Sequence, residues 1–138
     1  AVMIVDLDRF KSVNDLHRHV SGDAVLVEVA QRLADNLRLS DLVARIGGDE
    51  FLVALPDCNL ADAEATARRL CRVVQDRPIR LPDGRDLSVT VSIGLALAGE
   101  DALSAEDVSQ TIDRADRALL DAKARGRNQV IFGAASAA

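Results

Sequence analysis

The chain opens on a short continuous apolar segment, Val2–Leu7, and two acids, Asp6 and Asp8, stand at its end. An unbroken apolar run of this length is typical of a central β-strand that is buried on both faces. Two further apolar runs, 42–46 and 51–55, flank the Gly-Gly-Asp-Glu sequence of residues 47–50, and this pattern predicts a β-hairpin with an acidic tip. Residues 89–97 alternate between apolar and small positions, which predicts a half-buried strand, and residues 130–132 predict a last short one.

Three other segments carry apolar residues at helical spacing. The first covers residues 22–38, with a stripe of Leu26, Ala30, Leu33 and Leu37. The second follows Asn59 as its N-cap and precedes Pro78, with a stripe of Ala63, Ala67, Leu70, Cys71 and Val74. The third runs from a predicted cap at Ser104 to Gly126, with a stripe of Val108, Ile112, Ala115, Leu119 and Ala122. Asp83 and Gly84 predict a tight turn between the second helix and the strand that follows.

The predicted order of elements is therefore β-α-β-β-α-β-β-α-β. A central hairpin among alternating strands and helices favours an α/β sandwich of the α+β type, with helices packed on a mixed, mostly antiparallel sheet. Its core is the ferredoxin-like β-α-β-β-α-β arrangement of nucleotide-cyclase and palm domains. We expect one domain over residues 1–133 and an Ala/Ser tail over 134–138, and we interpret the sequence as an N-terminally truncated part of a longer protein.

Composition narrows the class of function. The 138 residues suit a single domain, and the net charge of −5 argues against a nucleic-acid surface, which needs a basic patch. No apolar run reaches the ~20 residues that span a bilayer, and no signal peptide is recognisable, so we expect no direct membrane contact. The two cysteines fit neither a disulfide framework nor a zinc motif, which favours a reducing, cytoplasmic compartment.

The acids suggest metal chemistry. Asp6 ends the first strand, and Asp49 and Glu50 occupy the hairpin tip, which a ferredoxin-like sheet can bring close to that strand end. Carboxylate oxygens are the ligands that Mg²⁺ prefers, so a metal between Asp6 and Asp49 is suited to phosphoryl-transfer chemistry. Asp8, by contrast, is interpreted as a solvated acid at a strand end.

The cations show an unusual bias, because Lys11 and Lys123 are the two lysines among 17 basic residues. Lysine supplies a compact point charge that arginine does not replace at phosphates. The bias alone is equally compatible with drift, and Lys123 taken alone is better explained as a cation that offsets the dipole of the third helix.

Several motifs stand at the spacing of a known family. Asp6–Lys11 with Asn14 and Asp15 matches D-x-D-x-F-K-x-x-N-D, and His19 with Gly22 and Asp23 matches G-H-x-x-G-D apart from Arg18 in place of its first glycine. Residues 45–51 give R-x-G-G-D-E-F, residues 91–94 give V-S-x-G, and residues 115–128 match A-D-x-A-L-Y-x-A-K-x-x-G-R-N with Leu120 in place of tyrosine. Over nearly its whole length the chain resembles the GGDEF domain of bacterial diguanylate cyclases.

That resemblance implies an enzyme that joins two GTP molecules into cyclic di-GMP and releases two pyrophosphates, with Mg²⁺, or alternatively Mn²⁺, as its cofactor. By resemblance, the metal ligands are Asp6, the Leu7 carbonyl and Asp49, and Glu50 supports a second metal position. Asp49 is also the expected acceptor of the proton from the attacking 3′-hydroxyl. Lys11 is expected to stabilise the transition state.

Further roles follow from the same resemblance. The resemblance implies a set of substrate-binding residues that face either the guanine base or the phosphates. They are Phe10, Asn14, His19, Asp23, Lys123 and Arg127. A product-inhibition site for cyclic di-GMP is implied at Arg38 and Asp41, an R-x-x-D motif, with Arg69 on the next helix. The implied partners are a second copy of the domain, because each copy binds one of the two GTP molecules, and an upstream sensory domain. The family's upstream D-x-L-T-x-L-x-N-R segment is absent from this sequence.

Two other readings stay open. One is a non-catalytic receptor that binds cyclic di-GMP through Arg38, Asp41 and Arg69, although such a receptor does not need the acids of the tip. The other is a GTP-binding regulator of a fused phosphodiesterase, which the sequence beyond residue 138 would decide. A polymerase palm shares the metal chemistry, but the negative net charge argues against it.

Overall fold

The computed structural model describes residues 1–99 and 105–135, without the side chains of residues 17–20, 105 and 106. The predicted cap Ser104 lies outside these residues. The elements, in chain order, are β1 (Val2–Leu7), α1 (Phe10–Asp35), β2 (Leu42–Arg45), β3 (Glu50–Ala54), α2 (Leu60–Gln75), β4 (Ile79–Arg80), β5 (Asp86–Leu87), β6 (Val91–Ala96), α3 (Ala105–Ala124) and β7 (Val130–Phe132).

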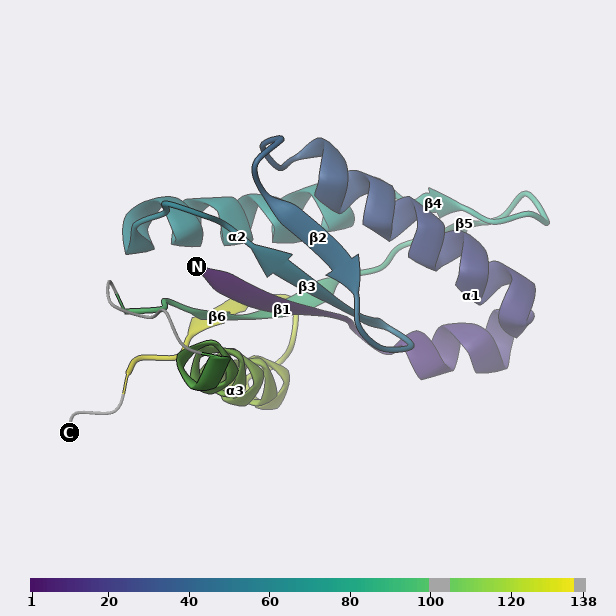
Figure 1. The fold of residues 1–138 in the computed structure, drawn as a ribbon. Coiled ribbons are helices and arrows are strands. Elements are labelled where there is room, and N and C mark those ends of the chain that lie inside the picture. Colours follow the sequence, from purple (N-terminus) through teal and green to yellow (C-terminus); the bar gives the residue numbers. More distant parts are fainter. Residues whose placement is uncertain (100–104, 136–138) are drawn as a thin grey trace.

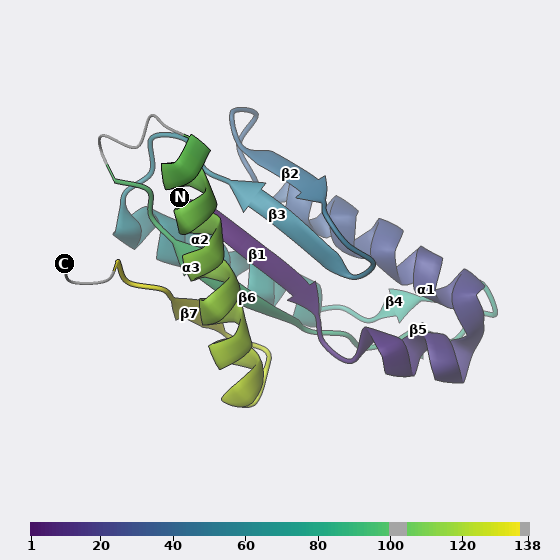
Figure 2. The ribbon, with the colours of Figure 1, turned by 60° about the horizontal axis from the view of Figure 1, so that its bottom comes forward.

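The main sheet has five strands in the order β2-β3-β1-β6-β7. Its neighbouring strands are antiparallel except for β6 and β7, which are parallel. Helices α1 and α2 lie on one side of this sheet and α3 on the other (Figures 1 and 2). The order β6-β1-β3-β2 with α1 and α2 on one side is the ferredoxin-like arrangement, so the predicted mixed, mostly antiparallel sandwich is confirmed.

The centre of the sheet is more deeply buried than its sequence pattern indicated. β1 is buried from Met3 to Leu7, as its continuous apolar run predicts. β6 was predicted to be half-buried, and that prediction is wrong, because each of its residues from Val91 to Ala96 is buried. The small residues Ser92, Gly94 and Ala96 of its polar-looking face lie under α3 rather than in water.

Helix α1 begins at Phe10 and ends at Asp35, whereas the sequence pattern predicted a helix over residues 22–38. Figures 1 and 2 show a sharp bend after its first turns. A Cβ added at Gly22 would lie 1.9 Å from Oδ1 of Asn14. Eight residues of straight helix span about 12 Å, so this close approach requires the chain to fold back on itself. The absence of a side chain at Gly22 makes room for Asn14.

The other helices follow their predicted patterns with one exception. Asn59 caps α2 by accepting a hydrogen bond from the backbone N–H of Asp62 at 2.8 Å, and the predicted apolar stripe of α2 is buried. Burial raises the pKa of Cys71 in this stripe to about 12, and the charge of Asp8 adds to that effect. The predicted stripe of α3 is buried from Ala115 to Ala122, but Val108 is 48% exposed and does not belong to the core.

A buried arginine joins α1 to the end of α2. Arg32 is 5% exposed, and its guanidinium donates to the carbonyl oxygens of Val74, Arg77 and Pro78 at 2.6–3.1 Å. It also pairs with Glu28 one turn earlier, at 2.9 Å. These bonds satisfy carbonyls at a helix C-terminus, where the backbone has no partner of its own.

After α2, strands β4 and β5 form a small separate hairpin around the predicted turn at residues 83–84.

Helix α3 lies directly on the backbone of β6. A Cβ added at Gly94 would lie 1.9 Å from the carbonyl oxygen of Ala115 and 2.4 Å from the backbone nitrogen of Leu119. Any other residue at Gly94 therefore has to push the helix away from the sheet.

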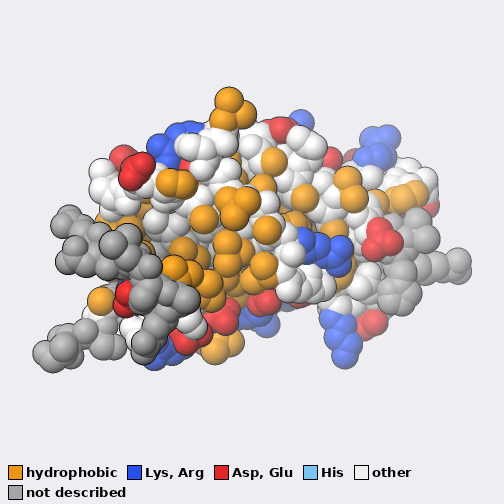
Figure 3. Space-filling view, in the orientation of Figure 1, with side chains coloured by type: hydrophobic (Ala, Val, Ile, Leu, Met, Phe, Trp, Pro, Cys, Tyr) orange, Lys and Arg blue, Asp and Glu red, His pale blue; other side chains and the backbone are white. Residues whose placement is uncertain are grey.

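The sheet face beside α3 is only partly covered. Hydrophobic side chains gather over β2 and β3 (Figure 3), where Leu42 and Ile46 are more than half exposed.

Among the helices that the structure describes, none combines the length and apolarity that a membrane span requires.

Gly94→Ala is expected to lower the free energy of unfolding by about 1–3 kcal/mol, because the added methyl group overlaps the backbone of α3. Urea unfolding followed by circular dichroism measures this change. The matched control is Gly99→Ala, since a Cβ at Gly99 meets nothing within 4 Å. Equal unfolding free energies for the two variants would contradict the close packing at Gly94.

Candidate active site

The register between β1 and β3 brings the predicted acids together. Asp6 lies opposite Glu50 in this antiparallel pair, and the backbone N–H of Leu7 donates to the carbonyl oxygen of Asp49 at 3.0 Å. The end of the first strand and the tip of the hairpin are therefore joined by backbone hydrogen bonds. The carboxylate of Asp6 thus meets those of Asp49 and Glu50, which are more than 40 residues away in sequence, at one end of these strands.

The tip itself is held by an arginine to which the sequence reasoning assigned no role. The guanidinium of Arg45 donates to the carbonyl oxygens of Gly47 and Gly48 at 3.0 and 2.9 Å. The backbone N–H groups of Ile46 and Gly47 both donate to the carbonyl oxygen of Glu50. Arg45 thus binds carbonyls that a two-glycine turn leaves without strand partners. Its position in the R-x-G-G-D-E-F motif was the available signal.

Lys123 reaches the acids from the last turn of α3. Its Nζ donates to Oδ2 of Asp6, and the two groups form an ion pair in which Asp6 is buried and Lys123 is half-buried. Burial alone would lower the pKa of Lys123, but the hydrogen bond to Asp6 and the charges of Asp49 and Glu50 raise it above its ordinary value. Lys123 is therefore a permanent cation at this site, and it does more than offset the dipole of its helix.

Asp6 is the most strongly perturbed carboxyl of the site. It is 3% exposed, and burial raises its pKa to about 6, against the lowering effect of the Lys123 hydrogen bond and with further raising by Asp49 and Glu50. Within residues 1–99 and 105–135, no three acidic, histidine or cysteine side chains stand close enough to form a ready metal cage. The three acids around one ammonium nevertheless leave negative charge in excess, which a divalent cation with few protein ligands would neutralise.

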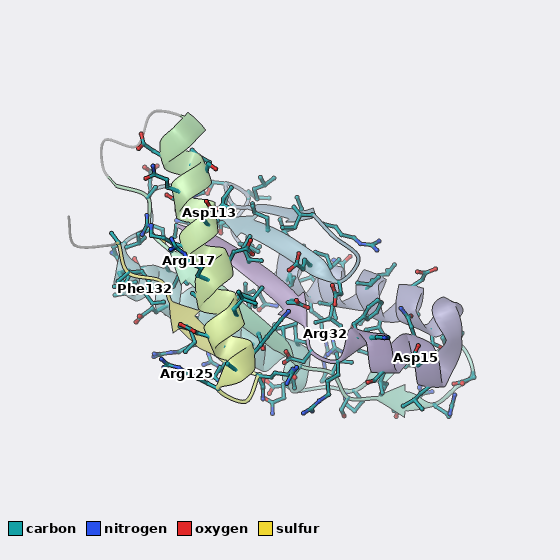
Figure 4. All side chains as sticks on the ribbon, turned by 90° about the horizontal axis from the view of Figure 1, so that it is seen from below. Asp15, Arg32, Asp113, Arg117, Arg125 and Phe132 are labelled. Carbon is teal, nitrogen blue, oxygen red and sulfur yellow. The ribbon has the colours of Figure 1, made fainter. Side chains whose placement is uncertain are left out.

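A hollow of about 610 Å³ opens beside this ion pair. Glu50 lines it from the hairpin, and α3 contributes Lys123, Leu120, Asp113 and Arg117, the last two of which are labelled in Figure 4. The cavity thus lies between the hairpin tip and α3, next to the ion pair of Asp6 and Lys123.

The residues predicted to contact guanine lie at the bend of α1. Asn14 contacts Gly22 across the bend, and Asp23 is the next residue along the chain, so the bend brings the backbone of Asp23 near Asn14. Phe10 contacts the same glycine position, with Cζ at 3.3 Å from an added Cβ. Lys11 is exposed one residue beyond Phe10. The side chain of His19 lies outside the described part of the structure.

Asp8 corrects the sequence interpretation. It is 7% exposed rather than solvated, and it accepts hydrogen bonds from the hydroxyl groups of Thr90 and Ser92 at 2.6 Å each. It also accepts the backbone N–H of Asn128 at 3.0 Å. Its partners are between 82 and 120 residues away in sequence, so the pattern of neighbouring residues does not predict these hydrogen bonds.

The predicted inhibitory residues line a separate cavity of about 290 Å³. Arg38 pairs with Asp41 at 3.0 Å and donates to the carbonyl oxygen of Pro56, while Arg69 donates to the carbonyl oxygen of Asn36 at 2.9 Å. Burial would raise the pKa of Asp41, but the hydrogen bonds and charge of Arg38 lower it. The structure therefore brings this trio together at the base of the β2–β3 hairpin, one strand length from the acidic tip.

Comparison with known proteins identifies similar domains. The family model described as "Diguanylate cyclase, GGDEF domain" matches residues 1–129. The diguanylate cyclase DosC of Escherichia coli is 38% identical over 136 residues, which cover 99% of this chain and 29% of DosC. The chain spans between 29% and 36% of the length of the curated relatives of this kind.

Solved structures give the same result. The crystal structure of the GGDEF domain of PA1120 (YfiN or TpbB) from Pseudomonas aeruginosa matches with a TM-score of 0.89 and 41% identity, over 98% of this chain and 82% of that one. The GGDEF domain of DgcB from Caulobacter crescentus, solved in complex with c-di-GMP, matches with a TM-score of 0.84 and 29% identity, over 96% of this chain and 76% of that one.

Asp6→Asn is expected to raise the free energy of unfolding by about 1–2 kcal/mol at pH 8 in metal-free buffer. Folding raises the pKa of Asp6, so the stability that its protonated form contributes is lost as the pH rises through about 6. A neutral amide avoids this loss. Urea titration measures the change, with the exposed Asp121→Asn as control. A lower unfolding free energy for Asp6→Asn than for the parent chain would show that the Lys123 pair outweighs the cost of burial.

Proposed function

Since the chain belongs to the GGDEF family of diguanylate cyclase domains, we propose that it condenses two GTP molecules into cyclic di-GMP and releases two pyrophosphates. The convergence of Asp6, Asp49 and Glu50 beside the permanent cation Lys123 carries this proposal. A family member that served as a receptor only would have no use for this arrangement of acids.

The residues at the hairpin tip suit a metal-dependent transfer. Asp6, the Leu7 carbonyl and Asp49 would hold Mg²⁺, or Mn²⁺ in its place, and Glu50 would support the charge of the site. The bound ion would neutralise phosphate charge as the α-phosphate is attacked. Asp49 accepts the proton of the attacking 3′-hydroxyl, and its backbone is fixed for this role by the hydrogen bond from Leu7.

The cations and the bend of α1 position the nucleotide. Lys123 and Arg127 bind phosphate oxygens, and Lys11 stabilises charge that develops during transfer. Asn14 and Asp23 read guanine, because a carboxylate accepts from N1–H and N2–H₂, two donors that adenine lacks. His19 belongs to the same predicted site, and Phe10 contacts the Gly22 position beside Asn14. One domain binds one GTP, so the reaction needs two copies facing each other, and dimerisation supplies proximity.

The cavity of Arg38, Asp41 and Arg69 is suited to product inhibition. Guanidinium groups recognise guanine edges and phosphates by paired hydrogen bonds. The relative DgcB was solved in complex with c-di-GMP, which supports a product-binding site in the family.

Asp49→Ala is expected to lower cyclic di-GMP synthesis by at least about a hundredfold, because it removes a metal ligand and the proton acceptor together. Chromatography of GTP reactions with and without Mg²⁺ measures this loss, and chelation of the metal is expected to have the same effect. The control is Asp76→Ala, at the exposed end of α2. Undiminished synthesis by dimeric Asp49→Ala protein would refute the cyclase assignment, and cyclic di-GMP binding without any synthesis by the parent chain would favour the receptor alternative.

Arg38→Ala and Arg69→Ala are each expected to raise the inhibition constant of cyclic di-GMP by about tenfold, through loss of a charged hydrogen bond to the ligand. Initial rates at increasing product concentration give this constant. Arg68→Ala is a matched control, because Arg68 is the exposed neighbour of Arg69 on α2 and does not line the cavity. An unchanged inhibition constant in both cavity variants would exclude this cavity as the inhibitory site.

A further inference from the structure

The proposed reaction gives no role to the most heavily hydrogen-bonded carboxylate near the site. Asp8 is 7% exposed and accepts three hydrogen bonds, two at Oδ2 and one at Oδ1. Two of the donors are hydroxyl groups, from Ser92 in β6 and from Thr90 just before it. Ser92 is fully buried, and the two hydroxyls hold the carboxylate in one orientation. The third donor, the backbone N–H of Asn128, belongs to the loop between α3 and β7.

That loop has an unfavourable backbone. Gly126, Arg127 and Asn128 have φ angles of 112°, 65° and 49°, so two consecutive residues with side chains adopt the left-handed conformation. Such residues cost on the order of 1 kcal/mol each and persist where the surroundings fix them. The backbone N–H of Arg127 donates to the carbonyl oxygen of Ala122 at 2.9 Å, and Asn128 is held by Asp8 at 3.0 Å.

The loop follows the end of α3, which carries Lys123 and which Figure 4 marks by Arg125. Strand β1 and the turn that follows it therefore hold both neighbours of the proposed phosphate site. Asp6 pairs with Lys123, and Asp8, two residues later, binds the loop that presents Arg127.

We propose that Asp8 is a positioning residue for triphosphate binding: by accepting the Asn128 N–H, it holds the left-handed loop so that Arg127 stands beside Lys123 at the nucleotide. This inference rests on the proposed function, in which Arg127 binds phosphate. Asp8 itself does not contact the substrate. It acts through a backbone hydrogen bond, so a neutral acceptor at the same place can replace it.

The test measures binding of α,β-methylene-GTP with Mg²⁺ by isothermal titration calorimetry, which requires no turnover. Asp8→Ala is expected to weaken binding about tenfold, as Arg127→Ala does, because each removes one phosphate contact. The double variant is expected to bind about as weakly as either single variant. In Asp8→Ala the phosphate contact of Arg127 is already lost, so removing Arg127 as well has little further effect on binding. Asp8→Asn keeps an acceptor oxygen and is expected to stay within about threefold of the parent chain.

Thr90→Val is the matched control for stability, because it removes a partner of the same carboxylate and leaves the Asn128 bond in place. Binding by Asp8→Ala equal to that of Thr90→Val, additive losses in the double variant, or equal losses in Asp8→Asn and Asp8→Ala would each overturn the inference. Failure of the parent chain to bind the analogue would overturn the proposed function as well.

If Asp8→Ala does not fold, amide hydrogen exchange in the parent chain decides the question. The Asn128 amide is expected to be protected from exchange although its residue is exposed. Exchange of this amide at the rate of an unstructured peptide would show that Asp8 does not hold the loop.

Discussion

The pairing register of β1 and β3 is the constraint on which the rest of the site depends. Because side chains alternate along a strand, a slip of one residue would turn Asp6 away from Glu50 and toward the core beneath α1 and α2. The register is fixed from both sides, since β1 also pairs with β6 along its whole length. A strand locked between two antiparallel neighbours can carry a buried carboxylate that an edge strand would leave in water.

Around this strand, the molecule accepts several unfavourable local states. Asp6 is buried with other acids near it, the loop after α3 holds two left-handed side-chain residues, and Gly94 gives up a side chain so that α3 can touch the sheet. Asp6 and the loop after α3 lie near the end of β1, whereas Gly94 lies opposite Ile4 in the middle of the sheet. Local frustration of this kind is expected where binding a ligand, rather than folding, selects the residues.

The sequence predicted those parts of the fold that follow from local periodicity. The hairpin, the stripe of α2 and the cap at Asn59 depend on neighbours in sequence, and they were found as predicted. The bend of α1 depends on the contact of Asn14 with Gly22, and the burial of Asp8 depends on partners in β6 and after α3. Such long-range contacts leave no periodic signal. The roles of the site residues came from resemblance to a family, which periodicity does not supply.

The β2–β3 hairpin connects two places with different chemistry. Its base lies at the cavity of Arg38 and Asp41, and its tip carries the acids, about 17 Å away at roughly 3.4 Å per residue over five residues. A small molecule confined to the base leaves the tip sterically free. If the chain condenses GTP as proposed, a ligand at the base would inhibit without competing with GTP, and a rising GTP concentration would not displace it.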